Sequence, residues 1–91
     1  LPGAWEAADA CLYTAAGQRN RNHTGPFVRF ETVPFPMEEV LFDPQTSGGL
    51  LLSVAPQDAI ALEAELQAVG LPAKIVGTIA ERQEPEITVI Y

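Results

Sequence analysis

The sequence of 91 residues predicts an α+β fold, a small mixed sheet covered by helices. Residues 56–69 place their apolar side chains at helical spacing, three and four residues apart. Residues 27–33 and 86–91 are instead rich in β-branched and aromatic residues, which is typical of strands. A chain of this length buries only about 60–65% of the surface that its unfolded form exposes. We therefore expect one domain at most, with a small margin of stability.

The first half of the chain predicts a helix, a loop, a strand and a second helix. Residues 3–12 carry apolar side chains on one helical face, among them Trp5. Residues 17–26 hold no apolar side chain between their two glycines and are expected to form a loop. The strand at 27–33 ends at two prolines, and residues 37–42 are long enough for a short helix.

The second half predicts strands on both sides of the helix at 56–69. Residues 50–54 and 73–80 are apolar enough to be strands, and the first is expected to be buried on both faces. With the helix between them they are expected to form a right-handed βαβ pair. Gly70 is the residue at which we expect the helix to stop.

Charge and cysteine content narrow the class of partners. Twelve acidic residues against five basic ones give a formal charge of −7, which argues against nucleic acid and against an anionic membrane as partners. The single cysteine, Cys11, allows no intramolecular disulfide, so the chain is expected in the reducing cytoplasm. No apolar run approaches the roughly 18 residues of a membrane span.

The segment 43–49, Asp-Pro-Gln-Thr-Ser-Gly-Gly, is the strongest candidate for a binding site. The Asp-Pro start favours a turn, the hydroxyls of Thr46 and Ser47 can donate hydrogen bonds, and Gly48-Gly49 permits backbone conformations closed to other residues. Such a loop can present several N–H groups to an anion. The alternative interpretation is a tight turn whose glycines are purely structural. It is not a P-loop, because no lysine follows the glycines where that motif requires one.

The run Asp43–Leu51 resembles the C-terminal part of selenide, water dikinases. Ile75-Val76-Gly77 and, more weakly, Leu1–Ala4 and Gly17–Asn20 extend this similarity. The family belongs to a superfamily that also contains aminoimidazole ribonucleotide synthetase. The resemblance spans most of the chain but is sharp only at 41–55, and residues 21–36 match poorly.

The resemblance implies an enzyme that converts ATP, selenide and water to selenophosphate, AMP and phosphate with Mg²⁺, as a homodimer. Residues 1–91 would be part of the C-terminal domain of a larger two-domain enzyme, inactive when isolated. The family's catalytic cysteine or selenocysteine and its Mg²⁺ ligands lie in the N-terminal domain, which would also bind most of the ATP. No catalytic or metal-binding residue is therefore expected here, and Thr46, Ser47, Gly48 and Gly49 are the predicted cofactor-binding residues.

Other polar residues have two interpretations each. Cys11 is expected to be a small buried core residue, because free cysteine is among the most buried residue types. Arg19 and Arg21 are either solvated loop charges or phosphate contacts. Asp43 is either a former of the turn or a carboxylate that faces a metal. Four acidic residues are expected on solvated faces: Glu38, Glu39, Glu63 and Glu65.

Two alternatives to the selenium enzyme stay open on sequence alone. The chain could belong to another ATP-dependent enzyme of the same superfamily, which the upstream sequence would distinguish. It could also be a non-catalytic α+β interaction module, in which the 43–49 loop is plain architecture and dimers form through an exposed strand edge.

Overall fold

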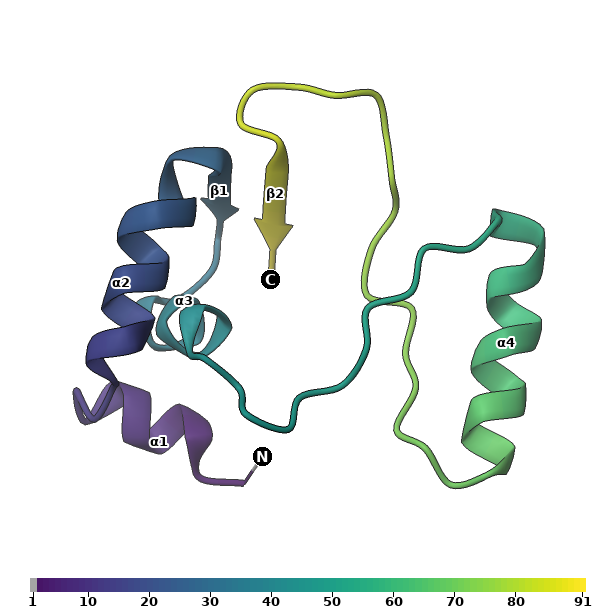
Figure 1. The fold of residues 1–91 in the computed structure, drawn as a ribbon, viewed down its shortest axis with the longest axis horizontal. Coiled ribbons are helices and arrows are strands. Elements are labelled where there is room, and N and C mark those ends of the chain that lie inside the picture. The colour runs from purple at the N-terminus through teal and green to yellow at the C-terminus, as the bar shows by residue number, and fades with distance from the viewer. Residues whose placement is uncertain (1) are drawn as a thin grey trace. The chain divides into compact units, whose positions relative to one another are not determined.

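The computed structural model describes residues 2–91 and divides the chain into two compact units (Figure 1). The first unit comprises the residues up to Ser47 together with Arg82–Tyr91, and the second is Gly48–Glu81. Helices and a strand pair in the first unit confirm the predicted α+β class. No helix among residues 2–91 is long and apolar enough to cross a membrane.

The first unit contains three α-helices, one turn of 3-10 helix and two strands. In chain order they are α1 (Ala4–Asp9), α2 (Ala15–Thr24), η1 (Gly25–Phe27), β1 (Val28–Glu31), α3 (Phe35–Phe42) and β2 (Ile87–Ile90). The strands pair in parallel, from Val28 opposite Ile87 to Glu31 opposite Ile90. Helices α1 and α2 both pack on α3 (Figure 1).

The core of the first unit is small and centres on α3. Ala8 of α1 and Phe42 of α3 are the buried hydrophobic residues among those described. The ring of Phe42 meets the ring of Phe30 edge to face, with 5.6 Å between their centroids, and so joins α3 to β1. Few side chains are removed from water, in line with the small margin of stability expected for this length.

Helices α1 and α4 (Pro56–Ala68) end in the same hydrogen-bonded motif. In α4, Gly70 N–H donates to the carbonyl of Gln67 and Leu71 N–H to that of Leu66, with Gly70 at φ 83°. This Schellman arrangement confirms Gly70 as the stop. In α1, Cys11 N–H donates to Ala8 and Leu12 N–H to Ala7, which places Cys11 at φ 59°.

Cys11 therefore corrects one expectation of the sequence. It is exposed and not buried, because it lies beyond the end of α1 in the left-handed conformation and not on the helix face that packs on α3. The apolar spacing that places it in a helix is real, but α1 ends two residues earlier, at Asp9.

The expected loop at 17–26 is also wrong, because residues 15–24 form α2. The Thr14 hydroxyl caps this helix by accepting from Gly17 N–H at 2.9 Å. The packing face of α2 carries Asn20 and Arg21, whose side chains contact α3 through hydrogen bonds and an ion pair. In most helices apolar side chains form the packing face, whereas in α2 polar side chains form it. The pattern of apolar residues therefore does not indicate this helix.

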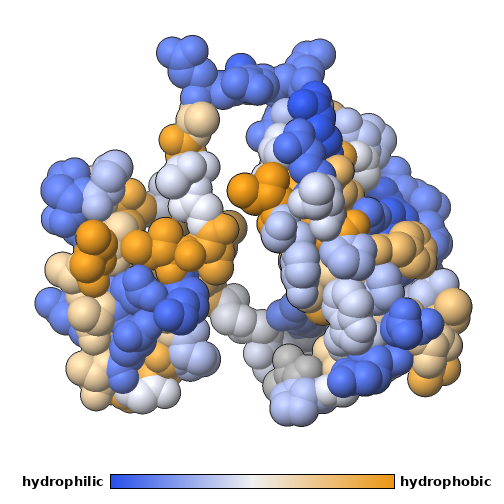
Figure 2. Space-filling view, turned by 180° about the vertical axis from the view of Figure 1, so that it is seen from behind, coloured by the Kyte–Doolittle hydropathy of each residue, from blue (hydrophilic) through white to orange (hydrophobic). Residues whose placement is uncertain are grey.

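The second unit consists of α4 between two extended segments. Residues 50–54 and 73–80 form no strand, so the expected βαβ pair is also wrong, and the parallel pairing found joins β1 to β2 instead. No residue from 48 to 81 is buried. Figure 2 shows hydrophobic side chains at the surface of this unit. Three hydrophobic residues of the unit are more than four-fifths exposed: Leu50, Leu51 and Ile79. Among residues 2–91 the sheet contains only β1 and β2, so neither segment is paired with a strand there.

Candidate functional site

The predicted site residues follow directly after α3. Helix α3 ends at Phe42, and Asp43 N–H donates to the carbonyl of Val40 at 3.3 Å as the chain leaves the helix. Thr46 and Ser47 form a turn, and both are exposed, as are Gly48 and Gly49. A side chain added at Gly49 would meet no atom within 4 Å. The hydroxyls and amides of this segment are therefore accessible to a ligand.

Asp43 is held by α2 at the start of this segment. The Thr14 hydroxyl donates to Asp43 Oδ1 at 3.0 Å, and Asn20 Nδ2 donates to the carbonyl of Phe42 at 2.9 Å. Gly17 lies against the same place, since a Cβ there would be 3.7 Å from both Asp43 Cα and the Phe42 carbonyl oxygen. Two of the segments that carry the resemblance, 17–20 and 43–51, therefore lie beside one another at Gly17 and Asp43.

Arg21 lies beside this contact, between α2 and two acidic residues of α3. Its Nη1 donates to Glu38 Oε2 at 2.9 Å, and its Nε lies 2.7 Å from Glu39 Oε1. The second distance is that of an ion pair, but the N–H is not aimed at the oxygen, so neither carboxylate oxygen of Glu39 has a hydrogen-bond partner within residues 2–91. The guanidinium also lies over the rings of Phe35 and Phe42, at 5.0 and 4.8 Å from their centroids.

This cluster settles two of the sequence interpretations. Glu39 is only 3% exposed, so the expectation of a solvated face is wrong for it; helix α3 turns this residue toward α2, where Arg21 supplies the compensating charge. Arg21 forms ion pairs with Glu38 and Glu39 and lies over two aromatic rings. In this arrangement its guanidinium is not directed toward a phosphate ligand. Arg19 is an exposed residue of the same helix. Gly17, Asn20 and Arg21 are three and four residues apart, so on a helix they share one face. This spacing would have indicated that Arg21 packs on α3, but only if residues 15–24 had been recognised as a helix.

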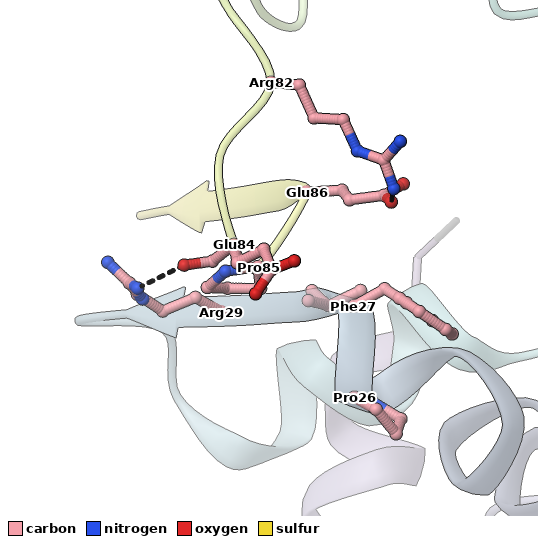
Figure 3. A pocket seen from close by; sticks show the side chains of 8 residues that line it. Pro26, Phe27, Arg29, Arg82, Glu84, Pro85 and Glu86 are labelled. Carbon is pink, nitrogen blue, oxygen red and sulfur yellow. Dashed lines mark hydrogen bonds and ion pairs between the residues drawn. The ribbon is translucent and has the colours of Figure 1, made fainter.

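A shallow pocket of about 510 Å³ lies away from these residues, between the start of β1 and the segment that leads into β2 (Figure 3). Arg29 Nη2 donates to the carbonyl of Glu84 at 3.3 Å, and Arg82 forms an ion pair with Glu86. Figure 3 shows these two pairs together with Phe27 and Pro26, which come from η1, directly before β1. Because the carboxylates of Glu84 and Glu86 balance the charges of Arg29 and Arg82, the pocket wall has no net charge with which to attract an anion. The sequence did not predict this pocket.

The described residues offer no metal centre. Within residues 2–91 no three His, Cys, Asp or Glu side chains come together as metal ligands. The most deeply buried of these carboxylates, on Glu39, is neutralised by Arg21.

Residues 12–90 match the family described as AIR synthase related protein, C-terminal domain. The chain is 53% identical over 90 residues to a selenide, water dikinase of Agathobacter rectalis, an alignment that covers 98% of this chain and 26% of that protein. It is 44% identical over 81 residues to the enzyme of that name from Desulfitobacterium hafniense, covering 89% of this chain and 24% of that one. It is 43% identical over 90 residues to a selenide, water dikinase of Pelobacter propionicus, an alignment that covers 97% of this chain and 26% of that protein.

These relatives confirm the resemblance read from the 43–51 run. The chain spans about a quarter of the length of the curated relatives that it matches. No solved structure matches the chain.

Proposed function

From the premise that the chain belongs to the family of AIR synthase related C-terminal domains, we propose that it is the C-terminal part of a selenide, water dikinase. The complete enzyme would convert ATP, selenide and water to selenophosphate, AMP and phosphate. The observation that carries the proposal is the 53% identity to the Agathobacter rectalis protein along nearly the whole chain. The three relatives described above all bear the name selenide, water dikinase, which favours this enzyme over the aminoimidazole branch of the superfamily.

The part proposed for this chain is to contribute Thr46, Ser47, Gly48 and Gly49 to the reaction cleft. Their hydroxyl and amide groups would donate hydrogen bonds to phosphate oxygens, since consecutive backbone N–H groups in a turn form a concave site for anions. The exposure of all four residues supports this role. Asp43, whose carboxylate is bound to Thr14, would shape the turn and not face a metal.

The proposal assigns Mg²⁺ and most of the ATP contacts to the remaining three-quarters of the polypeptide. The isolated chain is then expected to be inactive. The complete enzyme would be a cytoplasmic homodimer that binds ATP and selenide and neither nucleic acid nor membrane. For the part formed by these 91 residues, the charge of −7 disfavours contact with nucleic acid or with an anionic membrane.

A chimera tests the proposal directly. Residues 1–91 would replace the matching quarter of the Agathobacter rectalis enzyme, and phosphorus NMR would follow ATP in the presence of Mg²⁺ and selenide without oxygen. New signals of selenophosphate, AMP and free phosphate are expected from the chimera and from the unchanged enzyme. A folded chimera that leaves ATP intact, beside an active unchanged enzyme, would overturn the proposal.

Gly49 provides the test of the loop. A Cβ at Gly49 or at Gly77 would have no atom within 4 Å beyond the neighbouring residues, so both positions are open to a first side-chain carbon and suit a matched pair of valine variants. We expect Gly49→Val to lower the rate of the chimera about tenfold or more by blocking the approach of phosphate, because preorganised donors of this kind are worth that much or more. Gly77→Val is the matched control and should leave the rate unchanged. Equal rates for both variants would leave the glycines with a structural role only.

A further inference from the structure

We propose that Thr14, Gly17 and Asn20 of the α2 region act as positioning residues for Thr46 and Ser47, by clamping the point at which the chain leaves α3. This inference rests on the proposed function, because it assigns a purpose to contacts that would otherwise only join two helices. The three residues are spaced by three along the chain, so they lie along one side of α2 and its cap. Thr14 donates a hydrogen bond to Asp43, Asn20 donates one to Phe42, and Gly17 lies beside both of these residues.

The hydroxyl of Thr14 carries two hydrogen bonds at once. It accepts from Gly17 N–H at 2.9 Å, as the cap of α2, and donates to Asp43 Oδ1 at 3.0 Å. Because its lone pair faces the helix, its proton is free to point at the carboxylate. The start of α2 and the start of the 43–49 segment are therefore fixed to the same oxygen atom, and a hydrogen bond to a charged acceptor is stronger than a neutral one.

Asn20 holds the residue before Asp43, which is Phe42. The last four carbonyls of a helix have no partner within it, and Phe42 is the last residue of α3. Asn20 Nδ2 donates to the Phe42 carbonyl at 2.9 Å, so a side chain of α2 supplies the partner. The direction in which the chain leaves α3 thus depends on α2.

Gly17 lets the two segments approach this closely. A Cβ at Gly17 would lie 3.3 Å from the Thr14 hydroxyl oxygen and 3.7 Å from Asp43 Cα. A larger side chain would push against the atom that makes both of Thr14's hydrogen bonds. Thr46 and Ser47 begin three residues after Asp43, so a displacement at Asp43 is transmitted to their donors. Misplacement by about 1 Å away from the reacting atoms can lower a rate by roughly 100-fold.

NMR on the 91-residue chain tests the clamp without any activity. Thr14→Val removes the hydroxyl at nearly constant volume, and Thr14→Ser retains it. Thr24→Val is the matched control: Thr24 Oγ1 donates to the Asn20 carbonyl at 2.8 Å in the same helix but does not contact Asp43. We expect Thr14→Val to shift the amide signals of Thr46 and Ser47 and speed their hydrogen exchange, whereas Thr14→Ser and Thr24→Val leave both near wild type. Unchanged signals in Thr14→Val, or equal changes in Thr24→Val, would overturn the clamp.

Kinetics of the chimera then test positioning. We expect Thr14→Val to lower kcat by about 10- to 100-fold with KM for ATP within about twofold, because most ATP contacts lie outside this chain. Thr14→Ser should recover most of kcat. A positioning role would be contradicted if the fall in kcat of Thr14→Val matched the fraction of protein that is unfolded. It would also be contradicted if Thr24→Val lowered kcat by the same factor. An inactive wild-type chimera would instead contradict the proposed function, and the NMR result on the clamp would stand separately.

Discussion

Arg21 and Glu39 form an ion pair in which the acidic partner is almost completely removed from solvent: Nε lies 2.7 Å from Oε1, and the Glu39 side chain is 2% exposed. The arginine side chain is 23% exposed and shares its charge with Glu38. Burying a carboxylate without hydrogen bonds is unfavourable, and only the nearby guanidinium compensates for it. The charge of Arg21 is therefore a condition for α3 to present Glu39 to α2.

Arg21→Met should lower the free energy of unfolding by about 3 kcal/mol, because it leaves Glu39 buried without a compensating charge. The value is at the lower end of the range for buried pairs, since Arg21 keeps some contact with water. The double variant Arg21→Met with Glu39→Met should recover most of the loss. Urea unfolding followed by circular dichroism measures both, and Arg19→Met, on an exposed residue of the same helix, is the control. A change within about 0.5 kcal/mol for Arg21→Met, as for a surface substitution, would refute the argument.

Cys11→Gly should raise the free energy of unfolding by about 0.5–1 kcal/mol. Cys11 is a non-glycine residue at φ 59°, in the position that Gly70 occupies after α4. The left-handed conformation costs an L-residue about 1–2 kcal/mol, and part of that gain is offset by the greater freedom of glycine when unfolded. Cys11→Ala removes the same thiol, and with it the hydrogen bond to Tyr13, but keeps the strained conformation, so it should not raise the stability above that of the wild type. Thermal unfolding of the two variants side by side separates backbone strain from loss of the thiol; equal effects would exclude strain as the cause.

A third expected outcome concerns pH. A hydrogen bond with the Cys11 side chain, followed by the negative charge that its thiolate carries, raises the pKa of Tyr13 above the usual 10.0. The neutral phenol is the favoured form, so the contribution to stability is complete below about pH 10 and disappears as the pH rises through the raised pKa. In a Tyr91→Phe background, where Tyr13 is the only tyrosine, ultraviolet absorbance reports its titration. We expect Cys11→Ala to move that titration to lower pH; an unchanged midpoint would show that the thiol does not act on Tyr13.

Elements with an apolar or β-branched pattern could be predicted from sequence, whereas those built by polar contacts could not. Helix α4 and strand β2 follow from periodicity and residue type, and Pro56 and Gly70 mark the limits of that helix. Helix α2 was missed because its packing face carries Asn20 and Arg21 in place of apolar residues. The partners of these two side chains lie about twenty residues away on α3, and a local pattern does not contain them.

The candidate site shows the same division. Thr46–Gly49 could be singled out by turn chemistry and by resemblance, because the signal lies within one short segment. The support of that segment by Thr14 could not be predicted, since the hydrogen bond to Asp43 joins residues 29 apart. The strands expected at 50–54 and 73–80 show the opposite failure. Their residue types suit a sheet, but a strand needs a partner, and none pairs with them in the described part of the chain.

The isolated chain should self-associate through the second unit. Leu50, Leu51 and Ile79 are 89, 85 and 83% exposed, and they lie on extended segments whose backbone groups are open to pairing with another chain. Exposed apolar surface of this kind, next to unpaired strand-like backbone, favours association. Sedimentation velocity should show an average mass that rises with concentration, and the pair Leu51→Lys with Ile79→Lys should reduce the rise. Leu12→Lys, at a residue 73% exposed in the first unit, is the control and should not. A monomer at every concentration would mean that these segments are protected by some arrangement other than the one described.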